Sequence, residues 1–472
     1  MPGWTPFKKE IPDFMRTTIT AKENLAQLLN LDGHGPDLRC GGGGTCRRCG
    51  VRLLSGTWEV EGRIVEAPAE ALSCRTRLLS DRGEVEFTPS ADDGQIAAVW
   101  NSLPLPVRPE TVIAVDIGTT TLAAVKIRSG EIIAKASCFN AQAKYGDNVV
   151  SRINAAAHDL TGLQNAVRDS AESLLAELGL KNVVRIAIGG NTVMSCLFHG
   201  IDPAPIGIMP FIPPVRKFSE TSWHGIPLLT VPCIAGYIGG DLTAGLYETG
   251  LQPGEMLVDI GTNCEIIFNT CSGIICTAAA AGPAFEGAGL HFGCRATLGA
   301  IDHYRGNGGY SMLGDGEAQG LCGSAYVDFL AVERRNGHLN EFGRYMPQAK
   351  SMPVTDKIFV HEYDIEQLLK AKAAVRAGIK TLEDYCGRQA DRIYLAGGFA
   401  QYLDLQNAIA IDMLPQRQYT IVGNTSLGGA ARLAVAPEIM TELENLINLP
   451  REIPLNTLAE FEDNFIDALL LP

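Results

Sequence analysis

Four cysteines near the start of the chain have the number and spacing of ligands to an iron–sulfur cluster. Cys40, Cys46 and Cys49 lie in the glycine-rich stretch RCGGGGTCRRCG, and Cys74 follows after a strand-like segment. A [2Fe–2S] cluster is held by four Cys thiolates, and the plant-type spacing is C-x4-C-x2-C followed by a distant Cys. The first gap here has one extra residue, and its glycines can adopt the conformations that bring backbone amides close to a cluster. The sequence therefore predicts a [2Fe–2S] centre.

A zinc site and a set of disulfides are the alternatives to this cluster. Zinc favours paired Cys-x-x-Cys ligands, and Cys74 has no near partner in the sequence. Disulfides are rare in chains without secretory features. The other nine of the 13 cysteines show no second four-ligand spacing, so we expect mostly buried apolar thiols. Cys271 and Cys276 flank a short turn and could meet across a hairpin.

A second chemical pattern occurs twice, in TVIAVDIGTTTLAAVKI and in EMLVDIGTNCEIIF. Each copy is an apolar strand, an Asp-Ile-Gly-Thr turn and another strand. The glycine lets backbone amides approach a phosphate, and the threonine hydroxyls add donors. The carboxylates, Asp116 and Asp259, can hold Mg²⁺ through its waters. Two such hairpins that face each other could bind a nucleotide triphosphate from both sides.

Glycine pairs end further apolar strands. RIYLAGGFAQYLDL places Gly397, Gly398 and Phe399 between a strand and a helix, where a glycine pair permits close passage of a nucleoside. VVRIAIGGNTVMSCLF has the same strand–glycine–helix order, and in GNTSLGGAARLA a glycine pair opens a helix. Apolar strands that alternate with helices predict α/β layers.

Composition limits the class of protein and its surroundings. The chain has 472 residues, 46% hydrophobic and 19% charged, which is typical of a globular protein with large cores. The net charge of −14 argues against nucleic acid as a partner. No apolar run approaches the roughly 20 residues of a membrane helix, and MPGWTPFKKE lacks the apolar region of a signal peptide. We therefore expect no membrane partner, a cytoplasmic location and, by default, a two-fold homodimer.

Changes in sequence character predict the domain limits. Residues 1–90 form a small α+β unit around the cysteines, and residues 91–110 form a proline-containing linker. Residues 111–250 and 251–435 form two lobes that each begin with an Asp hairpin. Residues 436–472 form a helical tail.

DIGTTT, DIGTN and AGGF resemble the two phosphate motifs and the adenosine motif of the actin-like ATPase superfamily. Joined to an N-terminal [2Fe–2S] domain, they resemble one family closely, the reductive activators of corrinoid proteins. YGDNVVSRI, GPAFEGAGLHFGCRATLGAI, GLCGSAYVDFLA and LAEFEDNFIDALLLP are also similar to that family, so the resemblance covers nearly the whole chain. It implies a ferredoxin-like α+β domain followed by a two-lobed α/β actin-like (ribonuclease H-like) ATPase fold.

The resemblance implies ATP-dependent, one-electron reduction of a corrinoid protein of a methyltransferase system from Co(II) to Co(I). The cluster is the donor, an unidentified low-potential electron donor refills it, and Mg-ATP is bound and hydrolysed. Asp116 and Asp259 are the expected catalytic carboxylates. The expected nucleotide-binding residues are Gly118, Thr119, Thr120, Thr121, Gly261, Thr262, Asn263, Gly397, Gly398 and Phe399, and the expected cluster ligands are Cys40, Cys46, Cys49 and Cys74.

Two other functions stay open. One is an ATP-driven electron-transfer activator of a radical dehydratase or reductase, although such activators usually share a cluster between subunits. The other is a redox regulator that uses nucleotide as a switch without turnover. Asp147, Asn191 and Glu286 either face the cleft or have capping and turn roles. Asp364 and Gln367 are predicted to form a capping box at a helix start.

Overall fold

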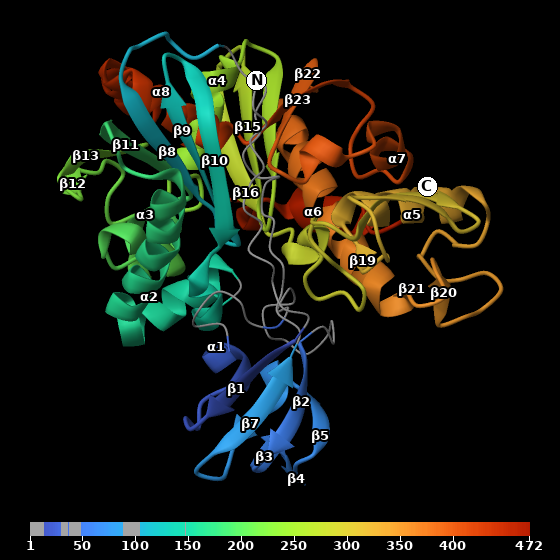
Figure 1. Cartoon of the computed structure of the whole chain (residues 1–472). Coiled ribbons are helices and arrows are strands. Elements are labelled where there is room, and N and C mark those ends of the chain that lie inside the picture. Colours follow the sequence, from blue (N-terminus) through green and yellow to red (C-terminus); the bar gives the residue numbers. More distant parts are fainter. Residues whose placement is uncertain (1–13, 30–35, 37–48, 88–103, 147) are drawn as a thin grey trace, which may run out of the picture. The chain divides into compact units, whose positions relative to one another are not determined.

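The structure is a computed structural model that describes residues 14–29, 36, 49–87, 104–146 and 148–472 (Figure 1). The chain divides into two units, the first made of residues 1–93 and 288–293 and the second of residues 94–287 and 294–472. Cys40, Cys46, Asp147 and most of the predicted linker lie outside the described residues.

The first unit is a small α+β domain built on a four-stranded sheet in the order β1-β7-β2-β5, with a second sheet in the order β4-β3-β6. Val51 and Leu53 alternate with exposed residues along β2 and enter a core around Trp58. The elements are β1 (Met15–Ile19), α1 (Leu25–Leu29), β2 (Gly50–Ser55), β3 (Thr57–Val60), β4 (Arg63–Glu66), β5 (Ala69–Leu72), β6 (Thr76–Leu78) and β7 (Gly83–Phe87).

The second unit contains two six-stranded sheets in which five strands have the same order and the sixth lies at opposite edges. The first has the order β10-β9-β8-β11-β13-β12 and the second the order β23-β22-β14-β15-β16-β24. In each sheet an antiparallel hairpin (β8–β9 or β14–β15) lies beside a parallel strand (β11 or β22). The sequence repeat of Asp hairpins is therefore part of a structural repeat of five strands, which β12 extends beside β13 in one sheet and β24 extends beside β16 in the other.

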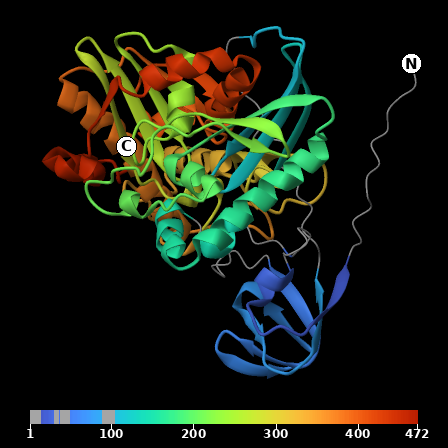
Figure 2. The same cartoon turned by 90° about the vertical axis from the view of Figure 1, so that its left-hand side faces the viewer.

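The strands of the first sheet are β8 (Thr111–Ile117), β9 (Thr121–Arg128), β10 (Glu131–Phe139), β11 (Val183–Gly190), β12 (Thr221–Trp223) and β13 (Ile226–Thr230). Alternate residues of β8 are buried on opposite faces. Ile113 and Val115 pack against α2 (Val149–Leu178) and α3 (Thr192–His199), whereas Val112 and Ala114 pack against α8 (Thr425–Val435). Figure 2 shows α2 lying across one face of this sheet. Burial of both faces explains the continuous apolar run of β8.

The second sheet contains β14 (Glu255–Ile260), β15 (Cys264–Thr270), β16 (Gly273–Ala279), β22 (Arg392–Ala396), β23 (Gln418–Gly423) and β24 (Pro450–Glu452). Helices α4 (Gly240–Thr249) and α6 (Glu362–Cys386) contact strands of this sheet. The other helices of this part of the chain are α5 (Gly323–Arg335), α7 (Leu405–Ala410), α9 (Met440–Leu446) and α10 (Ala459–Asp467). Smaller pieces are β17 (Ala300–Gly306), β18 (Gly309–Met312), β19 (Gly320–Leu321), β20 (Ser351–Pro353) and β21 (Phe359–His361).

Helices α4 and α8 pack closely against each other, side by side in Figure 1. A Cβ added to Gly429 would lie 2.4 Å from the Cβ of Ala244, so the glycine permits this close approach. Because α8 packs on the first sheet and α4 contacts β14 of the second, this helix pair joins the two lobes.

Two local expectations need correction. Helix α6 begins earlier than predicted, and its capping box pairs His361 with Asp364, whose Oδ2 accepts the His361 amide at 2.9 Å; Gln367 is not the partner. The predicted helical tail also contains a strand, because β24 pairs in parallel with β16. The predicted domain limits otherwise stay predictions.

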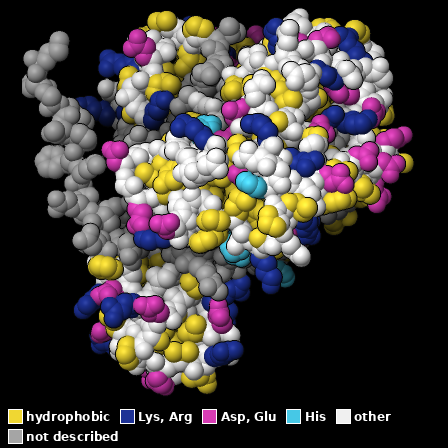
Figure 3. Space-filling model, turned by 90° about the vertical axis from the view of Figure 1, so that its right-hand side faces the viewer, with side chains coloured by type: hydrophobic (Ala, Val, Ile, Leu, Met, Phe, Trp, Pro, Cys, Tyr) yellow, Lys and Arg dark blue, Asp and Glu magenta, His cyan; other side chains and the backbone are white. Residues whose placement is uncertain are grey.

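Charged side chains of both signs are interspersed with apolar ones on the face shown in Figure 3. Among the described residues, no helix has the length and apolar character needed to cross a membrane.

Candidate functional site

Two of the four predicted cluster ligands lie side by side in the first unit. The Sγ atoms of Cys49 and Cys74 are 3.3 Å apart, and both side chains are buried against Ala26. This separation is far longer than the roughly 2.05 Å of a disulfide, and neither cysteine is in one. Two buried thiols this close can bind the same metal ion. They fit an iron–sulfur cluster, for which Cys40 and Cys46 would supply the remaining thiolates.

The turns of the two Asp hairpins have similar backbone arrangements. The Gly118 amide donates to the Thr121 carbonyl at 3.1 Å, and the Gly261 amide donates to the Asn263 carbonyl at 2.9 Å. A Cβ at Gly118 would lie 2.5 Å from the Thr121 carbonyl oxygen, so a larger residue would disturb the first turn. Each turn follows the strand that carries its aspartate, β8 for Asp116 and β14 for Asp259. The threonine hydroxyls of each turn therefore lie within a few residues of a carboxylate.

One carboxylate connects the two turns. The Thr120 hydroxyl donates to Glu286 Oε2 at 2.8 Å, and the Thr262 hydroxyl donates to Glu286 Oε1 at 2.8 Å. Glu286 ends a short 3-10 turn, Pro283–Glu286, called η5. The structure therefore brings the two predicted phosphate turns together at one position, and an anion already occupies it.

Asp116 is held in place by the start of helix α8. Ser426 Oγ donates to Asp116 Oδ1 at 2.6 Å, and Asn424 Nδ2 donates to Asp116 Oδ2 at 2.8 Å. Asn424 also caps α8 by accepting the Leu427 amide at 2.9 Å. Desolvation raises the pKa of Asp116, and the two hydrogen bonds oppose that rise. Both partners lie in GNTSLGG, where the sequence analysis noted only the glycine pair.

Further carboxylates gather near Asp116. Desolvation, together with the charges of Asp241 and Asp116, raises the pKa of Asp259 to about 8. Asp241, at the start of α4, and Glu265, on β15, also have raised pKa values, chiefly through desolvation. Neither residue was predicted from the sequence, because Asp241 lies outside the motifs and Glu265, two positions after Asn263, lies on the strand that follows the DIGTN turn. Mutual repulsion of this kind favours a bound cation or proton.

Mg²⁺ would have to be held through its waters in such an arrangement. Among the residues that the structure describes, no three His, Cys, Asp or Glu side chains are grouped closely enough to hold a metal ion directly. Mg²⁺ usually keeps several waters and takes one or two carboxylates together with substrate phosphates. The carboxylates Asp116 and Asp259 fit that kind of binding.

The predicted nucleoside motif lies at the end of β22. Gly397 has φ +93°, and a Cβ there would lie 2.6 Å from the Ile260 carbonyl oxygen and 2.7 Å from Asp259 Oδ1. Gly398 has open space on its Cβ side. Phe399 stacks on Phe285, with ring centroids 4.8 Å apart and an interplanar angle of 12°. In this motif the backbone at Gly397 therefore lies close to Asp259, and Phe399 forms a stacked aromatic pair with Phe285.

Of the three residues with two possible roles, Asn191 and Glu286 are described, whereas Asp147 lies outside the described residues. Asn191 does both things considered: it caps α3 by accepting the Met194 amide, and its Nδ2 donates to Thr119 Oγ1 at 3.1 Å. Cys271 and Cys276 do not meet, because Cys271 is exposed beside Arg388 while Cys276 is buried in β16.

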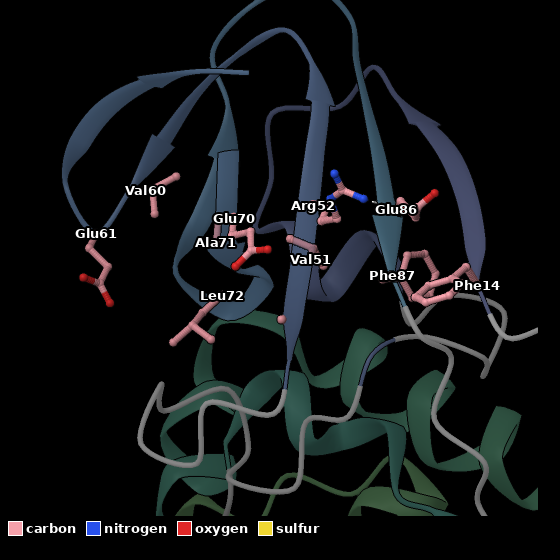
Figure 4. A pocket seen from close by; sticks show the side chains of 11 residues that line it. Phe14, Val51, Arg52, Val60, Glu61, Glu70, Ala71, Leu72, Glu86 and Phe87 are labelled. Atoms are coloured by element: carbon pink, nitrogen blue, oxygen red, sulfur yellow. Dashed lines mark hydrogen bonds and ion pairs between the residues drawn. The ribbon is translucent and has the colours of Figure 1, made fainter. Parts of the chain in front are cut away.

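A groove of about 560 Å³ lies on the first unit. Figure 4 shows the side chains of Arg52, on β2, and Glu86, on the neighbouring strand β7, pointing toward each other. Arg52 Nη1 and Glu86 Oε1 are 3.5 Å apart. Arg16 Nε donates to the other Glu86 oxygen at 2.6 Å. Glu86 is thus paired with two arginines, and Glu61 and Glu70 add further carboxylates to the groove lining.

The matching sheets, facing Asp hairpins and paired thiols define an actin-like ATPase fold that follows a [2Fe–2S] domain. Comparison with known families agrees. Residues 15–79 match the 2Fe-2S iron–sulfur cluster binding domain, residues 111–253 the RACo middle region, and residues 254–472 the C-terminal domain of RACo, the ASKHA domain. The chain belongs to the RACo family, and the predicted fold and family are confirmed.

Three relatives illustrate the similarity. The corrinoid activation enzyme RamQ of Eubacterium limosum is 28% identical over 75% of this chain and 69% of its own. The [Co(II) methylated amine-specific corrinoid protein] reductase of Methanosarcina barkeri is 27% identical over 59% of this chain and 60% of its own. A solved structure of a reductive activator for corrinoid, iron–sulfur protein has a TM-score of 0.71 and 25% identity, with 95% of each chain covered.

Proposed function

We propose that this protein reduces a corrinoid protein from Co(II) to Co(I) in a reaction that binds and hydrolyses Mg-ATP. The observation that carries the proposal is the meeting of two hydroxyl-bearing turns at one anion position in a chain that also carries paired, buried cysteine thiols. The relatives named for corrinoid activation and for a Co(II) corrinoid reductase support the choice of substrate.

The proposed nucleotide site uses the residues already described. The turns at Gly118–Thr121 and Gly261–Asn263 would bind the phosphates from either side through amides and hydroxyls. Asp116 and Asp259 would hold the waters of Mg²⁺ and orient the attacking water. Gly397–Phe399 would border the nucleoside, since its backbone is open on the Gly398 side.

The electron balance needs one external donor. The cluster that Cys40, Cys46, Cys49 and Cys74 would hold supplies the single electron that converts Co(II) to Co(I), and a low-potential donor replaces that electron. Plant-type clusters have potentials near about −400 mV. A target with a lower potential loses about tenfold in one-electron equilibrium constant for each ~59 mV of mismatch. ATP can offset that loss only if it binds the two states of the complex with different affinity.

An anaerobic mixing experiment tests the proposal. Reduced protein is mixed with a Co(II) corrinoid protein, with and without Mg-ATP, and Co(I) absorbance is followed. We expect Co(I) to accumulate only with ATP. A non-hydrolysable ATP analogue in a parallel sample separates the effect of binding from that of hydrolysis. If several corrinoid proteins give no Co(I) although nucleotide binds, the proposal is wrong, and the dehydratase-type activator or the nucleotide-gated regulator replaces it.

A further inference from the structure

Glu286 places a negative charge where the proposed function requires the negative charge of a nucleotide phosphate. Its two carboxylate oxygens accept one hydroxyl from each phosphate turn, at 2.8 Å from Thr120 and 2.8 Å from Thr262. Charge-assisted hydrogen bonds of this kind are the strong ones. Both hydroxyls are therefore engaged by a carboxylate of the protein itself.

We propose that Glu286 is an internal substitute for phosphate, which joins the two lobes when nucleotide is absent and is displaced when nucleotide binds. The inference rests on the proposed nucleotide site and deepens it. Each threonine hydroxyl has one proton to donate, so it cannot serve Glu286 and a phosphate oxygen fully at the same time. The two anions also repel each other at short range. Binding of a nucleotide must therefore release the carboxylate.

The position of Glu286 makes that release consequential. The turn η5 that carries it is attached to the second phosphate turn, because the Gly282 amide donates to the Thr262 carbonyl at 2.8 Å. Phe285, the preceding residue, stacks on Phe399 of the nucleoside motif. A shift of Glu286 would therefore act on the phosphate and nucleoside parts of the same site.

A second contact from the following segment reaches the first lobe. The Arg295 guanidinium lies 3.9 Å from the centroid of the Phe139 ring, at the end of β10. Glu286 and Arg295 are thus two points at which one stretch of the second lobe contacts the Asp116 hairpin and its neighbouring strand. If the Glu286 contact is lost, only the Arg295 contact of this pair remains. Nucleotide binding would therefore weaken the contacts that this stretch makes with the first lobe.

Glu286→Gln tests the proposal, because glutamine keeps the shape of the side chain and removes its charge. We expect the nucleotide-free variant to bind a non-hydrolysable ATP analogue with Mg²⁺ about tenfold tighter than wild type, since charge-assisted hydrogen bonds to a competing group are weakened. Isothermal titration calorimetry on the full chain measures the dissociation constants. Glu462→Gln, an exposed glutamate on α10, is the matched control and should leave affinity unchanged.

Amide hydrogen exchange supplies a second readout. Peptides that contain η5 should exchange faster in nucleotide-free Glu286→Gln than in nucleotide-free wild type. In wild type, added nucleotide should raise their exchange as well, because it displaces the same contact. Unchanged or weaker nucleotide binding by Glu286→Gln overturns the inference, and weaker binding would in addition indicate that the carboxylate serves the bound nucleotide. In that case wild type still binds nucleotide, so the proposed function survives; if neither protein binds it, both proposals are wrong.

Discussion

Asp259 is a carboxylate that the folded protein makes costly to ionise, so we expect Asp259→Asn to stabilise the nucleotide-free protein while it abolishes ATP hydrolysis. Desolvation and the charges of Asp241 and Asp116 raise the pKa of Asp259 from 3.8 to about 8. The folded state therefore binds a proton between these pH values that the unfolded state does not bind. The contribution of Asp259 to the free energy of unfolding therefore decreases as pH rises from about 4 to about 8, and it stays constant above that range.

The size of the effect follows from the same shift. Each pKa unit corresponds to about 1.4 kcal/mol. The penalty is therefore about 2 kcal/mol at pH 5 and about 5 kcal/mol at pH 8. Asp259 is partly exposed, and solvent screening reduces the difference between the two pH values from about 3 kcal/mol to roughly 1 to 2 kcal/mol. Asparagine has no charge to desolvate, so the variant should lose this part of the pH dependence.

Denaturant unfolding at pH 5 and pH 8, followed anaerobically by circular dichroism without nucleotide, measures the difference. Asp259→Asn should gain stability over wild type mainly at pH 8. Asp315→Asn, an exposed aspartate, should follow wild type at both values. Mg-ATP should stabilise wild type more than Asp259→Asn, because the variant lacks a proposed magnesium-binding carboxylate. Equal or lower stability of Asp259→Asn at pH 8 would refute the reasoning from the raised pKa.

Three further changes probe the cluster, the Asp116 carboxylate and the first-unit core. Cys49→Ser should lose the [2Fe–2S] visible spectrum and keep nucleotide binding, whereas Cys271→Ser should keep both. Ser426→Ala removes one of the hydrogen bonds to Asp116, so the rate of ATP hydrolysis should fall about tenfold while the cluster spectrum is unchanged. Gly83→Ala should destabilise the first unit by about 1–3 kcal/mol, seen as a lower melting temperature, because the new Cβ would lie 2.3 Å from Trp58 Cζ2.

Each of these changes has a result that would contradict it. A normal cluster spectrum in Cys49→Ser would remove that thiol from the ligand set. Ser173→Ala, at an exposed helix position, is the control for Ser426→Ala, and equal hydrolysis rates in the two would mean that Ser426 does not position Asp116. Gly50→Ala, in the same sheet as Gly83 but with no atom within 4 Å of its added Cβ, should melt like wild type. A Gly83→Ala protein as stable as Gly50→Ala would show that the core relaxes around the methyl group.

Patterns that are local in the sequence predicted much of this protein. The cysteine spacing, the two Asp-Ile-Gly-Thr hairpins and the continuous apolar strands each reflect geometry within a few tens of residues. Such patterns indicate a strand, a turn or a ligand set because neighbouring residues share one element. They predicted the cluster domain, the repeated hairpins and the α/β layers.

One prediction that depended on local pattern was wrong, and one possibility left open by the sequence is excluded. The proposed capping box started α6 at Asp364, but His361 and Asp364 form the box, because the helix extends one turn further toward β21. The possibility that Cys271 and Cys276 meet across a hairpin is excluded, because the β15–β16 register pairs Cys276 with Ile267 and leaves Cys271 in the turn. In both cases the neighbouring strand set the outcome.

Only the tertiary structure decided which side chains complete the site. Ser426 lies 310 residues from Asp116 in the chain, and Glu286 lies 166 residues from Thr120. Spacing cannot report such contacts, since they depend on how the helices between the sheets pack. The raised pKa of Asp259 has the same origin, because desolvation and nearby charge exist only after the lobes have assembled. The sequence by itself determined the chemical groups available, and the fold decided which of them act on one another.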